Sequence, residues 1–243
     1  MTKSALSAEG IFRAALRLVD DEGFDALTMR GLAAELGVAT MSLYGHVPTK
    51  DDLLLGMLNL VNEELALPPP TAPPWEALRS VTREFRRVAL LHPNLVPLIM
   101  QRPPTGSQGL LTLESALDAL CRAGIPASLT ARAYRLSASY AIGFVALECG
   151  GFFKPVEVSA GARIAPVDLG AIPRIIEAAG YLTEWDADAE FENGMDAIMG
   201  VLATWARSPD PGEMVEGNGR RSGDVQGVDA GAHRNPDLAV GSP

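Results

Sequence analysis

The stretch that decides the fold is residues 27–54, which read LTMRGLAAELGVATMSLYGHVPTKDDLL. Its first part has a short helical pattern with apolar residues on one face, and Gly37 then interrupts that pattern. A second short helix is predicted over residues 40–46. Two short helices joined by a tight turn form a helix-turn-helix, the motif that places its second helix in the major groove of DNA.

The second helix is expected to present small or polar side chains outward, namely those of Ala39, Thr40, Ser42 and Gly45. Side chains of this size let a helix sit deep in the groove, where hydroxyl and methyl groups meet base edges. Leu43 and Val47 are expected to face inward and hold the helix in place. Tyr44, His46 and Lys50 can reach phosphates, and the backbone N–H groups at the start of the next helix favour a phosphate as well.

Tyr44, His46 and Arg30, which are all candidates for DNA contact, also have a purely structural interpretation. Tyr44 could be a half-buried aromatic of the core, and His46 could cap the second helix. Arg30 could be an ordinary solvated helix residue, although its place in the first turn beside the groove favours DNA contact. The sequence leaves these alternatives open.

Helical patterns flank the motif on both sides. A helix is predicted over residues 8–22, and a long apolar helix over residues 50–65. Thr28 provides a hydroxyl at the start of the first motif helix, and Thr49 with Asp52 has the spacing of a capping box.

The remainder of the chain is also helical in pattern. The proline-rich stretch 68–74 (PPPTAPP) reads as a stiff extended linker, and 150–167 as a long loop. Further helices are predicted over 75–91, 110–123, 128–148, 168–179 and 186–205. No strand is predicted, so the expected fold class is all-α.

This pattern divides the chain into three parts. Residues 1–66 are predicted to form the helix-turn-helix domain, and 67–206 a helical domain for effector binding and dimerisation. Residues 207–243 are rich in Gly, Pro, Asp and Ser, and a disordered tail is expected there because little surface can be buried.

Composition limits the possible functions. The net charge of −10 means that DNA binding cannot rest on bulk charge, but residues 26–50 carry only Arg30, Glu35 and Lys50 as charged groups. With three histidines, no Gly-rich phosphate loop and no Gly-x-Ser-x-Gly motif, no enzyme is expected. Neither a secretory signal nor an apolar stretch long enough to span a membrane is visible. Cys121 and Cys149 are expected to be buried and unpaired, so the expected compartment is the cytoplasm.

Around residues 7–66 the chain resembles the DNA-binding domain of the TetR family of bacterial repressors. It has the family's short helix, Gly-Val turn, Ser/Thr-Leu-Tyr-x-His segment and Lys-x-x-Leu-Leu segment. The resemblance implies double-stranded DNA as a partner and a cytoplasmic homodimer. It implies DNA contacts by Arg30, Thr40, Met41, Ser42, Tyr44, His46 and Lys50. We add the flanking Thr28 and Ala39 as DNA-binding candidates.

The second half resembles the subgroup that contains the tetracycline repressor, through Trp75, 89–91, Arg102-Pro103, Leu120-Cys121 and 143–148. In that repressor the drug is bound with magnesium, which a histidine ligates. Leu98 stands at that position here, and Gln101 replaces a threonine. Neither tetracycline nor any metal or other cofactor is therefore expected.

The sequence thus predicts a repressor that binds a palindromic operator as a homodimer and is released by a small, mainly apolar effector. Arg102, Phe144 and Glu148 are the candidate effector contacts. Arg102 could instead bind carbonyl groups at a helix end, while Phe144 and Glu148 could belong to the core or the dimer interface. Two alternative functions stay open. One is an activator or architectural DNA-binding protein without an effector, and the other is a helical carrier or sensor of small molecules that does not bind DNA.

Two further expectations concern packing. The helices at 128–148 and 186–205 are expected to pair with their two-fold mates. The second of them would do so through the stripe Phe191, Met195, Ile198, Met199, Leu202 and Trp205. The arginines Arg79, Arg83, Arg86 and Arg87 are expected to form an ordinary solvated face, and His92 is expected to be structural.

Overall fold

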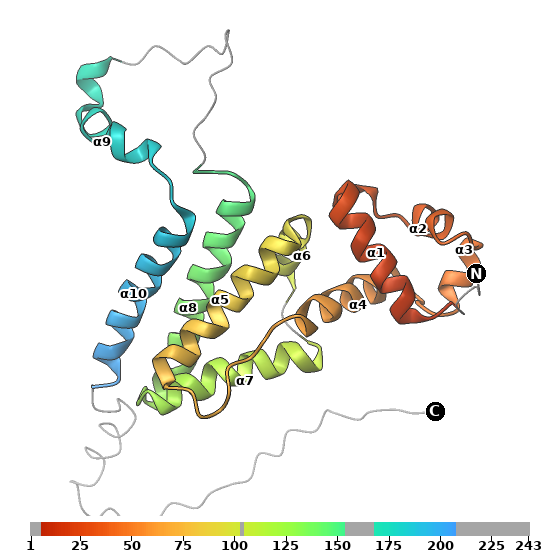
Figure 1. Ribbon diagram of the computed structural model, residues 1–243, viewed down its shortest axis with the longest axis horizontal. Coiled ribbons are helices and arrows are strands. Elements are labelled where there is room, and N and C mark those ends of the chain that lie inside the picture. The colour runs from red at the N-terminus through yellow and green to blue at the C-terminus, as the bar shows by residue number, and fades with distance from the viewer. Residues whose placement is uncertain (1–5, 103–104, 154–167, 208–243) are drawn as a thin grey trace, which may run out of the picture. The chain divides into compact units, whose positions relative to one another are not determined.

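The computed structural model describes residues 6–102, 105–153 and 168–207, and within these ranges the regular structure is helical throughout (Figure 1). The all-α fold class is therefore confirmed. The α-helices are α1 (Ala8–Glu22), α2 (Met29–Glu35), α3 (Thr40–Tyr44), α4 (Lys50–Glu63), α5 (Pro74–Leu91), α6 (Val96–Gln101), α7 (Ser107–Arg122), α8 (Ala127–Cys149), α9 (Pro173–Thr183) and α10 (Ala187–Trp205). Short 3-10 helices occupy Phe24–Ala26, Pro93–Leu95 and Leu169–Ala171.

Local sequence signals explain where the first helices begin. The Thr28 hydroxyl accepts a hydrogen bond from the backbone N–H of Gly31 at 3.0 Å, so the predicted cap of α2 is confirmed. At the start of α4 the backbone N–H of Asp52 donates to the Thr49 hydroxyl at 3.0 Å, and the Asp52 carboxylate accepts from the Thr49 backbone at 3.1 Å. The predicted capping box is thus present.

Helices α1 to α4 share one hydrophobic core. Its fully buried members include Ile11, Val19, Leu32, Leu43, Leu53 and Met57. Leu43 and Val47 face inward as predicted. The same core continues into later parts of the chain, because Val88, Leu95 and Leu98 are buried against it.

The described residues, which end at Arg207, form one compact unit. The proposed boundary between residues 66 and 67 stays a prediction, as does the division of the chain into three domains.

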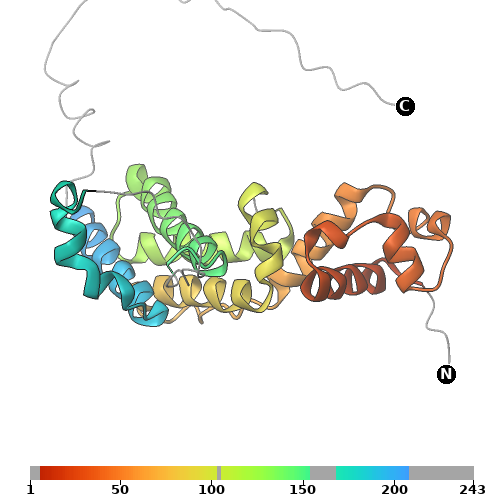
Figure 2. The ribbon, with the colours of Figure 1, turned by 90° about the horizontal axis from the view of Figure 1, so that it is seen from above.

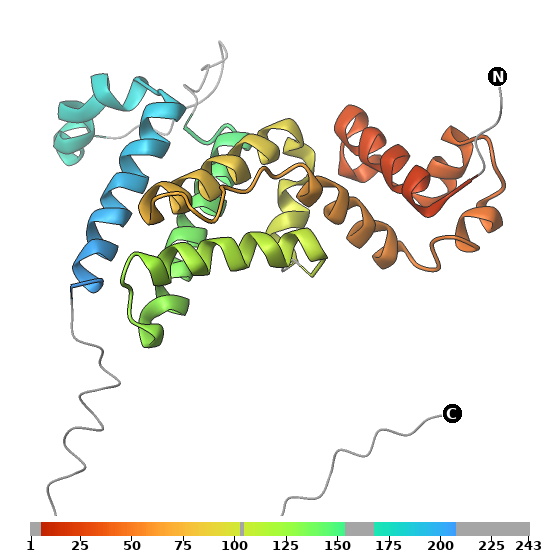
Figure 3. The same cartoon turned by 60° about the horizontal axis from the view of Figure 1, so that its bottom comes forward.

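A second core lies between α5, α7, α8 and α10. Figures 2 and 3 show α8 beside α5 and α7, with α10 against α8. The core contains small residues from the crossing helices and large ones from α10. Its members with no exposed surface are Ala119, Leu120, Ala133, Phe191, Met195 and Leu202.

This packing corrects the predicted dimer stripe on α10. Phe191, Met195, Met199 and Leu202 are buried inside the chain, and Ile198 and Trp205 pack against the same core. The apolar face of α10 is therefore used within the subunit. A subunit interface on this helix must involve its opposite face.

Three other expectations differ from the structure. Helix α6 was not predicted, because Pro93 and Pro97 read as helix breakers, although proline is tolerated in a first turn. Cys121 is exposed and Cys149 is half-buried, whereas both were expected to be buried, and neither of them forms a disulfide. The helix expected over 168–179 lies at 173–183.

The loop expected over 150–167 is described only as far as Phe153, and the tail beyond Arg207 lies outside the described residues. Within the part of the chain that the structure describes, no helix has the length and apolar character that crossing a membrane requires.

Candidate DNA-binding surface and effector cavity

Helix α3 is held by one apolar contact face and is otherwise open to solvent. Leu43 is fully buried beneath it, whereas Met41 is 78% exposed and Tyr44 is 41% exposed. The turn that precedes α3 depends on Gly37, whose φ of +65° lies in the left-handed region. A short, exposed helix anchored on a rigid base has the form that major-groove insertion requires.

The structure places the DNA-binding candidates on α3 and on the adjoining ends of α2 and α4. All of them are exposed except Thr40, which is half-buried: Thr28, Arg30, Ala39, Met41, Ser42, Tyr44, His46 and Lys50. Two of these residues are also engaged locally. The Thr28 hydroxyl caps α2, and the Lys50 ammonium donates to the backbone carbonyl of Leu27 at 3.2 Å.

The acidic residues that follow Lys50 both have partners. The Asp52 carboxylate accepts hydrogen bonds from the backbone and the hydroxyl of Thr49 at 3.1 and 2.7 Å. Asp51 pairs with Arg102, whose guanidinium nitrogens lie 2.7 and 3.3 Å from the two carboxylate oxygens. The positive charge of Arg102 offsets that of Asp51, which reduces the repulsion that a phosphate near Lys50 would meet.

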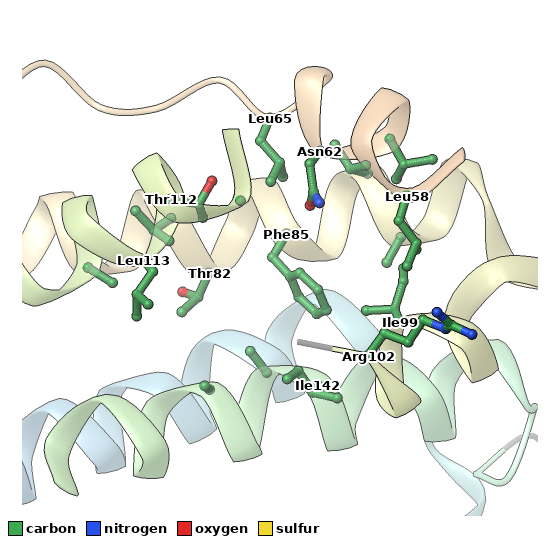
Figure 4. Close-up of a pocket in the computed structure, with 18 of the residues that line it drawn as sticks. Leu58, Asn62, Leu65, Thr82, Phe85, Ile99, Arg102, Thr112, Leu113 and Ile142 are labelled. Carbon is green, nitrogen blue, oxygen red and sulfur yellow. The ribbon is translucent and has the colours of Figure 1, made fainter. Parts of the chain in front are cut away.

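A cavity of about 380 Å³ lies behind this surface and is lined by residues of α4 to α8. This volume falls in the range of small-molecule sites in proteins. Figure 4 shows Phe85 of α5 between Asn62 of α4 and Ile142 of α8. The walls are mainly aliphatic, so the cavity suits a ligand with an apolar body.

Arg102 lies at one end of this cavity beside Ile99 (Figure 4). It is the only charged residue among the described residues that line the cavity, and its side chain is 25% exposed. The hydrogen bond and the positive charge of Arg102 hold the pKa of Asp51 below its ordinary value. The predicted effector contact therefore joins the cavity to the first turn of α4.

The arginines of α5 do not all lie on a solvated face, although a solvated face was expected. Arg86 is buried against α8, where its guanidinium binds the Glu148 carboxylate through two hydrogen bonds of 2.8 and 2.7 Å. Arg79 donates to Glu192 of α10 at 2.7 Å and also pairs with Asp196. Arg83 is exposed, as expected, but its guanidinium also donates to Glu192 at 2.6 and 2.9 Å. Arg79, Arg83 and Arg86 therefore join α5 to α8 or α10. Arg87 is exposed and pairs with Glu84 of its own helix.

His92 has the structural role that was expected. Its Nδ1 lies 2.9 Å from an Asp20 carboxylate oxygen, and its Nε2 lies 3.2 Å from a Glu64 oxygen. Nearby, the Asn94 amide donates to the carbonyl oxygens of Val19 and Asp20 at 2.9 and 3.1 Å. These bonds fasten the end of α1 to the segment that links α5 and α6.

Comparison with known proteins identifies the family. Residues 11–57 match the family described as "Bacterial regulatory proteins, tetR family", and residues 68–204 match "Tetracyclin repressor-like, C-terminal domain". The chain belongs to the TetR family of transcriptional regulators. The resemblance seen in the sequence is thus confirmed over both halves.

Individual relatives support this placement. An HTH-type transcriptional regulator of Saccharopolyspora erythraea is 37% identical over 60% of the chain, and the match spans 63% of that relative's length. The class A tetracycline repressor of Escherichia coli is 30% identical over 84% of the chain and 92% of the repressor. Among solved structures, Streptomyces coelicolor ActR in complex with actinorhodin superposes with a TM-score of 0.72 at 29% identity, covering 84% of this chain and 100% of ActR.

Two of the predicted effector contacts of this TetR-family protein lie outside the cavity. Glu148 is occupied by Arg86, and both side chains are almost fully buried, with 12% and 13% exposed. Phe144 of α8 packs with its ring centroid 5.6 Å from that of Trp185, which precedes α10, and 5.3 Å from that of Phe191 in α10. An effector role for Phe144 and Glu148 stays a prediction that the geometry of this cavity does not support.

The residues that do line the cavity were largely missed, because they come from five helices and share no sequence motif. Asn62 and Phe85 are examples, since each reads as an ordinary position on an amphipathic helix. Among the described residues, no group of three or more His, Cys, Asp and Glu side chains is placed to hold a metal ion. Leu98, where the resemblance to the tetracycline repressor implied a histidine that binds metal, is buried in the core of the first four helices.

Proposed function

We propose that this TetR-family regulator represses transcription by binding a palindromic operator as a homodimer, and that a small, mainly apolar effector releases it. Residues 1–66 would form the DNA-binding part and 67–206 the effector-binding and dimerisation part, acting in the cytoplasm. In support, ActR has been solved in complex with actinorhodin and with (S)-DNPA, so a protein of this fold takes small molecules.

The observation that carries the proposal is the double role of α4. Its first residue, Lys50, adjoins the α3 surface, and its later residues Leu58 and Asn62 line the cavity. A ligand that changes the position of α4 would also change the position of α3. In a dimer both recognition helices must reach half-sites about 34–36 Å apart, so a small displacement is enough to prevent simultaneous binding.

The proposed DNA contacts are made by the residues of α3 and the adjoining helix ends, namely Thr28, Arg30, Ala39, Thr40, Met41, Ser42, Tyr44, His46 and Lys50. Hydroxyl and small side chains would meet base edges, and the phenol and the cations would meet phosphates. A ligand that favours the non-binding dimer by a few kcal/mol would release the operator.

The test is fluorescence anisotropy with a duplex from the promoter next to the gene. Replacing Tyr44→Ala together with Lys50→Ala should weaken binding about tenfold or more and reduce the salt dependence, because phosphate contacts are lost. The matched control is Tyr181→Ala with Arg174→Ala, an exposed aromatic and cation on α9, which should leave binding unchanged.

Two outcomes would count against the proposal. Equal affinity of the Tyr44/Lys50 variant and the wild type would show that the contact assignment is wrong. Absence of binding to every duplex at low ionic strength would favour a small-molecule carrier or sensor, a function with which the net charge of −10 is compatible.

A further inference from the structure

The polar side chains that line the cavity differ in whether their hydrogen-bond donors are already used within the protein. Three lining hydroxyls already donate to backbone carbonyls of their own helices: Thr82 to Arg79 at 2.9 Å, Thr112 to Gln108 at 2.9 Å and Ser137 to Ala133 at 3.1 Å. Burial raises the pKa of Tyr134, so this lining residue stays a neutral phenol. Arg102 is the only charged residue among the described residues that line the cavity, so its guanidinium can form the strongest hydrogen bond with a charged ligand group there.

The present partner of Arg102 is easy to replace. The Asp51 side chain is 71% exposed, so water can solvate its carboxylate when the guanidinium leaves. An anionic group on a ligand inside the cavity has no such alternative, because the aliphatic walls do not solvate it. Exchange of one carboxylate for another at Arg102 would therefore cost the protein little and would stabilise a bound anion.

We infer that the cavity selects effectors in which an apolar body carries one acidic group, and that this group takes over Arg102 from Asp51. The inference rests on the proposed function and specifies the chemical class of its effector. A neutral analogue of the same shape fills the cavity but leaves the Asp51–Arg102 pair intact.

The exchange also has a consequence for α4. Asp51 lies in the first turn of this helix, between Lys50 and the Asp52 of the capping box. Loss of its partner removes a link between the C-terminal end of α6 and the helix that follows the DNA-binding α3. An acidic effector thus acts on α4 in two ways, by contact with the α4 residues that line the cavity and by loss of the Asp51–Arg102 ion pair.

The experiment uses two fluorescent probes of the same ring body. The compound 8-anilinonaphthalene-1-sulfonate carries one sulfonate, and N-phenyl-1-naphthylamine is its neutral counterpart; both brighten in apolar surroundings. Wild-type protein should bind the sulfonate at least about tenfold more tightly than the neutral probe, as expected for a charge-assisted bond in an apolar site. The variant Ala138→Phe, which fills the cavity from α8, should weaken binding of both probes.

Variants at the Asp51–Arg102 pair distinguish binding that depends on the charge of the probe from binding that depends on its shape. Arg102→Gln should lower the affinity for the sulfonate about tenfold and leave the neutral probe within about twofold, whereas Arg102→Lys should keep the preference. Asp51→Asn should raise the affinity for the sulfonate alone, because the competing charge is gone. Arg13→Gln and Glu9→Gln, which alter an exposed pair on α1, are the matched controls and should change nothing.

Three results would overturn the inference: equal affinity of wild type for the two probes, a sulfonate preference that survives Arg102→Gln, or no binding of either probe. Should Arg102→Gln fail to fold, Asp51→Asn still decides, because it changes an exposed side chain at the opposite end of the pair. None of these measurements involves DNA. A chain that binds the sulfonate through Arg102 but binds no operator would contradict the proposed function and leave this inference standing.

Discussion

At the scale of single residues, Gly37 and Gly45 flank α3 in opposite backbone conformations. Gly37 has a φ of +65°, whereas Gly45 has a φ of −68° and a ψ of −20°, which any residue adopts. An added Cβ at Gly37 would meet no atom within 4 Å, and at Gly45 it would lie 3.5 Å from the Ser42 carbonyl oxygen. Both positions have room for an added methyl group, so the effect of an alanine substitution on stability measures the backbone strain at each position.

We expect Gly37→Ala to destabilise the protein by about 1 kcal/mol, because a left-handed conformation is strained for residues with a Cβ. Gly45→Ala should be neutral or stabilise the protein by about 0.5 kcal/mol. The reason is that alanine lowers the conformational entropy of the unfolded chain and adopts this backbone conformation in the folded protein without strain. Thermal unfolding of both variants checks this, and Gly37→Ala should have the lower midpoint by roughly 2–4 °C relative to wild type. Equal midpoints for the two variants would contradict the role assigned to Gly37.

At the scale of helices, Glu192 connects α10 to α5. It accepts hydrogen bonds from Arg83 at 2.6 and 2.9 Å and from Arg79 at 2.7 Å. The Arg83 hydrogen bonds are the largest cause of a lowered pKa for this carboxyl, and those from Arg79 add to them against the opposing effect of burial. A carboxyl whose pKa is lower in the folded than in the unfolded state stabilises the fold above its unfolded pKa and loses this effect in acid.

We therefore expect Glu192→Gln to lower the free energy of unfolding at pH 7 by about 1 kcal/mol, allowing for partial solvent screening. The difference from wild type should be complete above the ordinary glutamate value of 4.5 and should vanish as the pH falls through the lower, folded-state pKa. Urea unfolding across this pH range measures it. The matched control is Glu177→Gln, in the exposed pair with Arg174, which should change the free energy of unfolding at pH 7 by less than about 0.5 kcal/mol.

The elements also show what the sequence alone could predict. Helix starts with local signals were found, because the groups involved lie within three residues of each other, as at Thr28 and in the Thr49–Asp52 box. Helix α6 was missed, because its prolines obscured a short helix that tertiary packing supports. The Arg86–Glu148 pair was also missed, because it joins positions 62 residues apart that no local pattern connects.

The candidate site also has a part that could be predicted from the sequence and a part that could not. The α3 surface could be predicted because its residues are consecutive and the alternation of buried Leu43 with exposed neighbours appears in the sequence. The cavity could not, because its walls are assembled from five helices by packing between distant segments. Arg102 was singled out from the sequence as a polar residue near a bend, and the structure places it at the cavity, while its effector role stays a prediction. Its partner Asp51 became evident only from the fold.

At the scale of the whole molecule, the exposed faces of α8 and α10 suggest where the subunits of the proposed homodimer would meet. Leu136 and Leu147 on α8 are partly exposed and are spaced eleven residues apart, which places them on one side of the helix. On α10, Val201 is 48% exposed and lies beside the exposed small residues Ala197 and Gly200. An apolar, closely approachable surface of this kind suits helix packing between two-fold related copies.

We accordingly expect the double substitution Leu136→Glu with Val201→Glu to yield monomers, because a symmetric interface would have to bury four carboxylates without partners. Sedimentation equilibrium should show the loss of the dimer, and operator affinity should fall by roughly a hundredfold or more, since a monomer reaches only one half-site. The matched control is Leu90→Glu with Leu91→Glu, an exposed apolar pair at the end of α5, which should remain dimeric. A Leu136/Val201 variant that sediments as a dimer and binds the operator normally would show that the subunits do not meet through α8 and α10.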